Sequence, residues 1–310
     1  MSYLNTVNSI FNLISIFLDM IAFIICLSFL SIIAYHFIQR NHHHHNQIIN
    51  NVPLILSINT LCIIITKSIF QTIHITIPTI MKDFHNITQT EETFICRLKA
   101  YILWSIVGQL YWSYVLLAFF RFVRIIYPKQ LWLCRSFFYL YILIPCQFIF
   151  VFIGILPSFL FFDCIHLIPN EAFCDILIKP AYFCAYSNTI AFGIPYTILC
   201  IFYIKIGQKM RQPSMIRLHQ ERNRRDYIVI KRMLLNSILL CLIAVPYVVL
   251  YIISIFYEYL NSTTLRFQWL SSSFGSFLFS LFLPLITTQL GNLLKSNKII
   301  PRNDQTERRD

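Results

Sequence analysis

Seven long apolar stretches, separated by shorter polar and charged segments, divide the chain. Each is long enough for the roughly 20 apolar residues that a helix needs to cross a bilayer core about 30 Å thick. They lie at residues 9–38, 52–80, 95–122, 136–162, 181–206, 230–257 and 267–290. The pattern therefore predicts an all-α membrane protein, built as a bundle of seven transmembrane helices.

The composition agrees with this prediction. Hydrophobic residues make up 57% of the 310 residues and charged residues only 12%, whereas a soluble domain carries about 25% charged residues. We recognise no cleavable leader before the first stretch, so we expect it to be retained as a span. The expected domains are an extracellular amino terminus (1–8), the helix bundle (9–290) and a short cytoplasmic tail (291–310) that includes an amphipathic stub.

Lysine and arginine are concentrated on one side of the predicted bundle. Nineteen of the 25 lie in the tail or in and around the segments that follow the first, third and fifth stretches, and five lie on the other side. Because cytoplasmic loops hold the basic excess, we predict that the amino terminus lies outside and the carboxyl terminus inside. The glycosylation sequons at Asn86 and Asn261 both fall in loops that this count places outside.

The net charge of +12 is thus expected on the inner face, where it suits anionic membrane lipids or an acidic partner rather than nucleic acid. The histidine run 42–45 resembles a metal-binding tract. It has no cysteine or carboxylate beside it, so we expect neither a metal site nor a cofactor. Enzyme motifs, such as a phosphate-binding glycine loop, are also absent from the sequence, so we expect no enzyme activity.

Cys96 and Arg121 are 25 residues apart in the third stretch. In a helix that is about 37 Å, roughly one membrane thickness, so the cysteine lies at the outer mouth when the arginine lies at the inner one. At an oxidising surface Cys96 has two possible disulfide partners in the following outer loop, Cys164 and Cys174.

This interval resembles that of rhodopsin-like (class A) G-protein-coupled receptors, between the disulfide cysteine of helix 3 and the arginine of the Asp/Glu-Arg-Tyr motif. The fifth stretch, FGIPYTILCIFY, resembles the family's Phe, Pro and Tyr pattern with Phe192, Pro195 and Tyr203. Pro246 in CLIAVP and Pro284 in LPLIT resemble the prolines of helices 6 and 7. The resemblance covers nearly the whole chain, and we expect Cys174, which is nearer the fifth stretch, to be the partner of Cys96.

The sequence also departs from the family pattern at its switch residues. Phe120 stands in place of the acid beside Arg121, and Ala244 in place of the helix 6 tryptophan. Leu283 and Thr287 replace the polar ends of the helix 7 motif, and the second stretch has no aspartate in its core. We therefore expect no sodium site of the usual kind.

The resemblance assigns G-protein coupling to Arg121 and Tyr203, with Arg124 beside them. Alternatively, the arginines are interfacial side chains that extend to the membrane surface. Pro195, Pro246 and Pro284 are candidate hinges, because proline removes a helical hydrogen bond, although such kinks also occur without a switching role.

The resemblance places a ligand pocket among the outer halves of helices 3, 5, 6 and 7. Leu103 takes the place of the amine-binding aspartate, which disfavours an amine ligand. Lys67 is the clear ionisable residue inside a span, and it either faces an anionic group or reaches toward the outer surface. The expected pocket residues are Lys67, Leu103, Trp104, Val107, Ser187, Asn188, Tyr247, Tyr251, Trp269 and Ser273.

The resulting hypothesis is an orphan receptor of the plasma membrane that transmits the binding of an extracellular non-amine ligand, either a peptide or a small molecule, to a heterotrimeric G protein. The alternatives are a chemosensory seven-span protein of an unrelated family, a decoy receptor that no longer signals, and a channel or transporter. The last needs a polar pathway or repeated halves, and the sequence contains neither.

Overall fold

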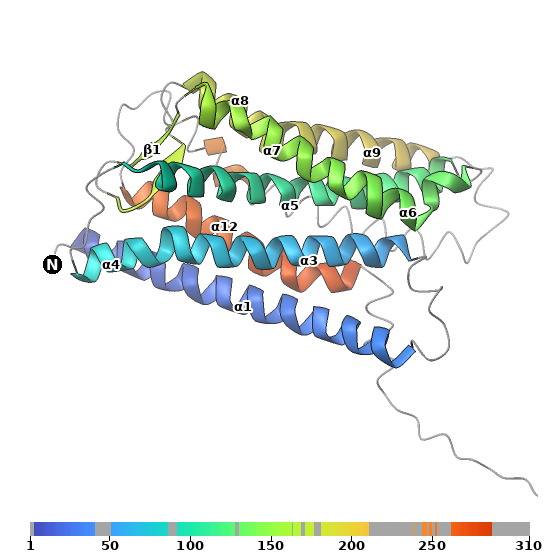
Figure 1. Ribbon diagram of the computed structural model, residues 1–310, viewed down its shortest axis with the longest axis horizontal. Coiled ribbons are helices and arrows are strands. Elements are labelled where there is room, and N and C mark those ends of the chain that lie inside the picture. The colour runs from blue at the N-terminus through green and yellow to red at the C-terminus, as the bar shows by residue number, and fades with distance from the viewer. Residues whose placement is uncertain are drawn as a thin grey trace, which may run out of the picture.

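The computed structural model of the protein shows an elongated bundle of helices that lie side by side along a common axis (Figure 1). The residues that the structure describes are 3–40, 51–85, 92–127, 130–162, 164–168, 171–176, 181–210, 238, 244–246, 248–249, 252 and 262–286.

Six of the seven predicted spans are described as continuous rods. In chain order they are α1 (Tyr3–Arg40); α3 (Val52–Gln71) with the π-helical turn η1 (Thr72–Thr76) and α4 (Ile77–His85); α5 (Phe94–Ile126); α6 (Ser136–Phe138) with η3 (Tyr139–Leu143) and α7 (Ile144–Leu160); α8 (Ala181–Asn188) with η4 (Thr189–Gly193) and α9 (Ile194–Met210); and α12 (Ser262–Ile286). A 3₁₀ turn, η2 (Leu131–Cys134), precedes α6.

The rods differ from the predicted spans mainly at their ends. Residues 3–8, which we assigned to the amino terminus, are the first turns of α1, and α12 begins five residues before the predicted position 267. Of the predicted sixth span, the described residues are 238, 244–246, 248–249 and 252, and all are helical. Among the described residues, the first five rods have the length and apolarity to cross a membrane.

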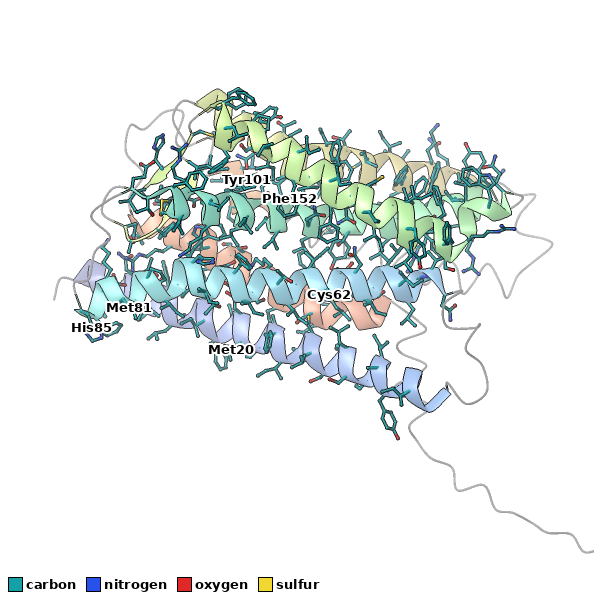
Figure 2. The ribbon with its side chains drawn as sticks, viewed as in Figure 1. Met20, Cys62, Met81, His85, Tyr101 and Phe152 are labelled. Atoms are coloured by element: carbon teal, nitrogen blue, oxygen red, sulfur yellow. A yellow bond between two sulfur atoms is a disulfide. The ribbon has the colours of Figure 1, made fainter. Side chains whose placement is uncertain are left out.

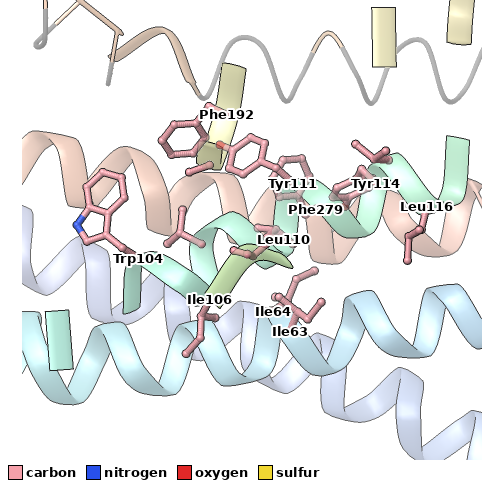
Figure 3. Close-up of a cluster of buried hydrophobic side chains, with 14 of the residues drawn as sticks. Ile63, Ile64, Trp104, Ile106, Leu110, Tyr111, Tyr114, Leu116, Phe192 and Phe279 are labelled. Atoms are coloured by element: carbon pink, nitrogen blue, oxygen red, sulfur yellow. The ribbon is translucent and has the colours of Figure 1, made fainter. Parts of the chain in front are cut away.

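α5 is the central helix of the bundle. It runs between α3 and α7 (Figure 1), and 83% of its most apolar 18-residue stretch is buried, against 22% for α1. The buried side chains around it include Tyr111 and Phe192, whose rings meet edge to face at 4.6 Å (Figure 3). At Gly108, a Cβ would lie 2.9 Å from Cγ1 of Val151, so this glycine permits α7 to approach.

The outward faces of the helices are apolar as well. Met20 on α1 and Met81 on α4 are each 48% exposed (Figure 2). Polar groups are instead directed inward, as where the hydroxyl of Tyr101 donates to the backbone carbonyl of Phe152 at 2.9 Å. An apolar exterior over a partly polar interior is what a helix bundle in lipid requires.

Three spans contain a π-helical turn, and each turn ends two residues before a proline. The prolines are Pro78 after η1, Pro145 after η3 and Pro195 after η4. Proline has no N–H and its ring collides with the carbonyl four residues earlier, so the helix widens locally. Pro195, predicted as a hinge, therefore lies beside an irregular turn, as do two prolines that we did not single out.

Among the described residues, two short strands interrupt the helical architecture. The strands β1 (Ile165–Leu167) and β2 (Cys174–Ile176) form an antiparallel pair in which Ile165 faces Ile176 and Leu167 faces Cys174. The prediction of an all-α chain is therefore wrong in this loop. Each strand has only three residues, too few for an alternating pattern to be recognised.

Candidate functional site

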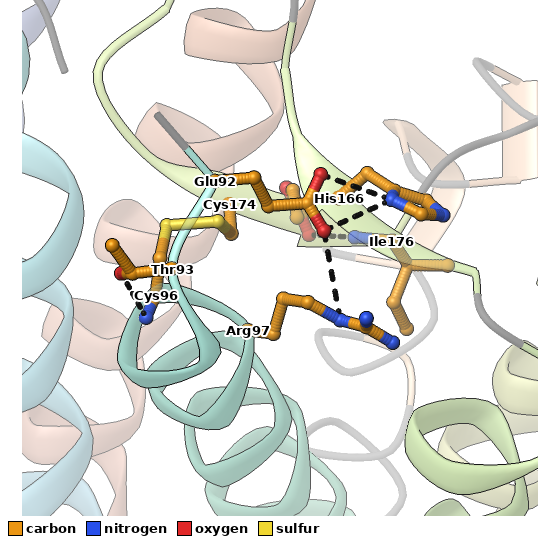
Figure 4. The surroundings of a disulfide bond; sticks show 8 residues. Glu92, Thr93, Cys96, Arg97, His166, Cys174 and Ile176 are labelled. Carbon is orange, nitrogen blue, oxygen red and sulfur yellow. Dashed lines mark hydrogen bonds and ion pairs between the residues drawn. A yellow bond between two sulfur atoms is a disulfide. The ribbon is translucent and has the colours of Figure 1, made fainter. Parts of the chain in front are cut away.

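A disulfide fixes the hairpin β1–β2 to one end of the bundle, which we call the disulfide end. Cys96, in the first turn of α5, is bonded to Cys174 of β2, with their Cα atoms 5.6 Å apart (Figure 4). The predicted pairing is confirmed. Cys164 keeps a buried thiol outside the disulfide, and its Sγ donates to the carbonyl of Ser158 at 3.0 Å. The opposite end of α5 carries Arg121, and we call it the arginine end.

The hairpin places a buried carboxylate between two helices. The indole N–H of Trp104 on α5 donates to Asp175 Oδ1 at 2.6 Å, and that of Trp269 on α12 donates to Oδ2 at 3.0 Å. The backbone N–H of Ile176 adds a third bond at 2.8 Å. Burial raises the pKa of the Asp175 carboxyl to about 6, although the three donors act in the opposite direction. The hairpin is thus clamped to both helices by one side chain.

A second clamp joins the hairpin loop to α4 and α12. The guanidinium of Arg266 donates to both oxygens of Asp83 and, at 3.0 and 3.1 Å, to the two oxygens of Glu171. The side chains of Arg266 and Glu171 are 3% and 0% exposed. Asn12 of α1 also donates to Asp83, at 3.1 Å. Because a buried ion pair of this kind is costly to break, it holds the loop over the disulfide end.

A polar cluster lies deeper, between α1, α3 and α12. The ammonium of Lys67, 1% exposed, donates to the carbonyl of Ser272 at 2.9 Å and to Ser276 Oγ at 2.7 Å. The hydroxyl of Ser273 donates to Asp19 Oδ2 at 2.9 Å. The charges of Lys67 and Asp19 interact, so the ammonium faces groups of the protein itself, and the contact of Lys67 with a ligand stays a prediction.

Other predicted pocket residues are dispersed. Leu103 and Val107 are buried on α5, at 2% and 5% exposure. Ser187 shares a 2.6 Å hydrogen bond with Ser158, so its hydroxyl faces the fourth span, and Asn188 is half-buried beside it. The structure does bring Trp104 and Trp269 together, with ring centroids 6.3 Å apart. Tyr247 and Tyr251 lie outside the described residues.

At the arginine end, Arg121 is half-buried and Arg124 exposed. Phe120, which takes the place of the acid, is 6% exposed and packs edge to face on Tyr139 at 5.5 Å. Tyr203 is half-buried on α9, and next to it Phe202 stacks on Phe122 at 4.8 Å. Aromatic packing therefore joins α5, η3 and α9 where the resemblance places coupling residues.

Several predictions fall on residues that the structure does not describe: the sequons at Asn86 and Asn261, the histidine run 42–45, most of the basic residues that follow the fifth stretch, and the tail from 291. Pro246 and Pro284 lie at described helical positions. Within the described ranges, no group of three or more His, Cys, Asp or Glu side chains is placed to hold a metal ion.

Four acids with structural roles were not predicted: Asp83, Glu171 and Asp175 at the disulfide end, and Asp19 in the deeper polar cluster. The scarcity of acidic residues was a weak indication of such roles. The chain has only 13 of them, and an acid within or beside an apolar span is costly unless it is paired.

A bundle of membrane-spanning helices with a disulfide-tethered loop over one end defines a multi-pass membrane protein of the seven-helix receptor class. The family model of the 7 transmembrane receptor (rhodopsin family) matches residues 69–286, more than two thirds of the chain, and the protein therefore belongs to that family. Members are in general signalling receptors and not enzymes. A comparison with curated proteins finds no significant match.

Proposed function

We propose that the protein is a plasma-membrane receptor whose disulfide end faces outward, binds an extracellular ligand, and thereby changes the coupling of its arginine end to a heterotrimeric G protein. The observation that carries the proposal is that α5 joins the two ends. Its first turns hold Cys96 and Trp104, and its last turn but one holds Arg121.

The physical basis is a difference in binding between two conformations. A ligand shifts a conformational equilibrium only as far as its affinities for the two states differ. A ligand that competes with Asp175 for the indoles of Trp104 and Trp269 would change the packing of α5 against α12. Because α5 is buried along most of its length, its displacement is transmitted to its neighbours rather than absorbed by lipid.

Guanine-nucleotide exchange in membranes from cells that express the receptor tests the coupling role, first without ligand and then across a panel of peptides and small molecules. Arg121→Ala should lower exchange by about tenfold or more, because a charged hydrogen bond contributes roughly 1.5–3 kcal/mol. Arg135→Ala, an exposed arginine of the same end, is the matched control. Equal exchange for wild type and Arg121→Ala, at equal surface expression, would remove the proposed role of Arg121.

The orientation is tested separately. An epitope at residue 1 should bind antibody on intact cells, and glycosidase treatment should reduce the apparent mass unless Asn86 and Asn261 are both replaced by glutamine. An epitope that binds antibody only after permeabilisation would invert the proposed topology.

A further inference from the structure

A cavity of about 90 Å³ lies at the disulfide end, apart from the space between Trp104 and Trp269. Its wall consists of η1 and the start of α4, the first turns of α5, and the hairpin loop at Ala172, Phe173 and Cys174. Figure 4 shows the part of this wall at the start of α5, where Thr93 lies beside the disulfide between Cys96 and Cys174. The cavity thus lies between the second and third spans, and of the predicted pocket residues its wall includes Leu103.

The titratable side chains in the cavity wall, apart from the two disulfide cysteines, are both basic: His74 of η1 and Lys99 of α5. They are close enough for their charges to interact. Among the residues that the structure describes, neither forms a hydrogen bond or an ion pair, although His74 packs on the ring of Phe70 at 5.1 Å. Two neighbouring basic groups without an acid favour an anion between them.

The acids that the structure describes near the cavity are bound elsewhere. Glu92 contacts His166 at 3.1 Å and Arg97 at 3.7 Å (Figure 4), and Glu171 is held by Lys82 and Arg266. The amino-terminal turn of α5 also forms part of the wall, and the positive end of a helix dipole favours negative charge. His74 lies in the π-helical turn η1, and such turns occur frequently at functional sites.

The size of the cavity limits what enters it. Drug-sized ligands occupy about 300–1,000 Å³, so a cavity of about 90 Å³ accepts a small head group and the first few carbons of a chain. Ile73 and Ile95 line the cavity and are 50% and 61% exposed on the outside of the bundle. An apolar chain that leaves the cavity would therefore lie on these side chains, in the lipid.

We infer that this cavity binds the carboxylate or phosphate head of a single-chain amphiphile, with Lys99 and His74 holding the head group and Ile73 and Ile95 supporting the chain. The inference does not rest on G-protein coupling, and it is tested by direct binding. The anion enters either from the leaflet at the disulfide end, as part of a lipid, or from water, as a small free anion.

The test uses the full-length protein in nanodiscs of phosphatidylcholine and a photoreactive palmitic acid. Wild type should be labelled in peptides that contain Ile73 or Ile95, and unlabelled palmitate should compete while its uncharged methyl ester should not. Competition by acetate or inorganic phosphate at similar concentrations would indicate that the anion enters from water. Competition by palmitate alone would indicate that it enters from the membrane. Either result supports an anion site.

The variants separate charge from folding. Lys99→Gln should reduce labelling about tenfold, Lys99→Arg should restore most of it, and His74→Phe, which keeps the aromatic contact, should reduce it severalfold. Lys205→Gln removes an exposed lysine of α9 and should label like wild type. Labelling of Lys99→Gln at the wild-type level, equal competition by the methyl ester, or labelling confined to other peptides would overturn the inference, whatever the outcome of the exchange assay.

Discussion

Replacing Asp175 by asparagine should remove a pH dependence that the wild-type stability shows between about pH 4 and pH 6. Burial raises the pKa of the Asp175 carboxyl from 3.8 to about 6. In the unfolded chain the carboxyl regains its ordinary pKa, so between these two values the folded protein binds more protons than the unfolded chain. Linkage then requires the free energy of unfolding to fall as the pH rises through this window.

The size of the effect follows from the difference between the two pKa values. A shift of about two units corresponds to roughly 3 kcal/mol, lost between about pH 4 and pH 6. The carboxylate is fully buried and its donors are uncharged indole and backbone N–H groups, so little of this cost is offset by a cation. Asparagine keeps the shape and one acceptor but does not ionise.

Thermal unfolding of the purified protein in mild detergent, at pH 4.5 and at pH 7, measures the effect. Wild type should unfold several degrees lower at pH 7 than at pH 4.5, and the difference should shrink in Asp175→Asn. Glu92→Gln, which neutralises a carboxylate that is 34% exposed, is the control and should keep the wild-type difference. An equal pH effect in wild type and Asp175→Asn would refute the argument from burial.

Two further substitutions test the packing of the bundle. Gly108→Leu should destabilise the protein by about 1–3 kcal/mol, because a Cβ there would already lie 2.9 Å from Val151. Gly207→Leu is the control and should have little effect, because no atom lies within 4 Å of a Cβ at that position. Similar melting temperatures for both variants would contradict the close approach of α5 and α7. Lys67→Met should lower surface expression, because it leaves the charge of Asp19 unbalanced. Adding Asp19→Asn should restore part of the lost surface expression. If the double variant is expressed no better than Lys67→Met, the two charges do not depend on each other.

The sequence predicted the spans well because apolar length is a local property that lipid imposes on each helix separately. Position alone left both Cys164 and Cys174 as possible partners of Cys96. The family resemblance and the nearness of Cys174 to the fifth span favoured the pair that the structure shows. The Asp175 clamp was not predictable in this way. It requires Trp104, Trp269 and a loop residue to converge, and these are separated by more than 70 positions.

Other differences have equally specific causes. Ser187 was placed in the ligand pocket by counting from Pro195, but its hydroxyl bonds to Ser158 of the fourth span. The count assumed a regular helix, whereas η4 inserts a π-helical turn between the two positions. Residues near such a turn are rotated about the helix axis, so the direction in which their side chains point cannot be derived from a period of 3.6 residues.

One face of α12 carries the residues that bind the hairpin, α1 and α3. Trp269, Ser273 and Ser276 follow one another at helical spacings of four and three residues, and they bind, in turn, the hairpin carboxylate, the aspartate of α1 and the lysine of α3. Arg266, three residues earlier, continues the same stripe to the second clamp. The helix 2 aspartate and helix 7 asparagine of the family pattern are missing, and the buried polar contacts lie instead closer to the disulfide end. A rotation of α12 would therefore break the contacts to Asp175 together with those to α1 and α3. Under the proposed function, a ligand that displaced the hairpin would act on the whole of this helix.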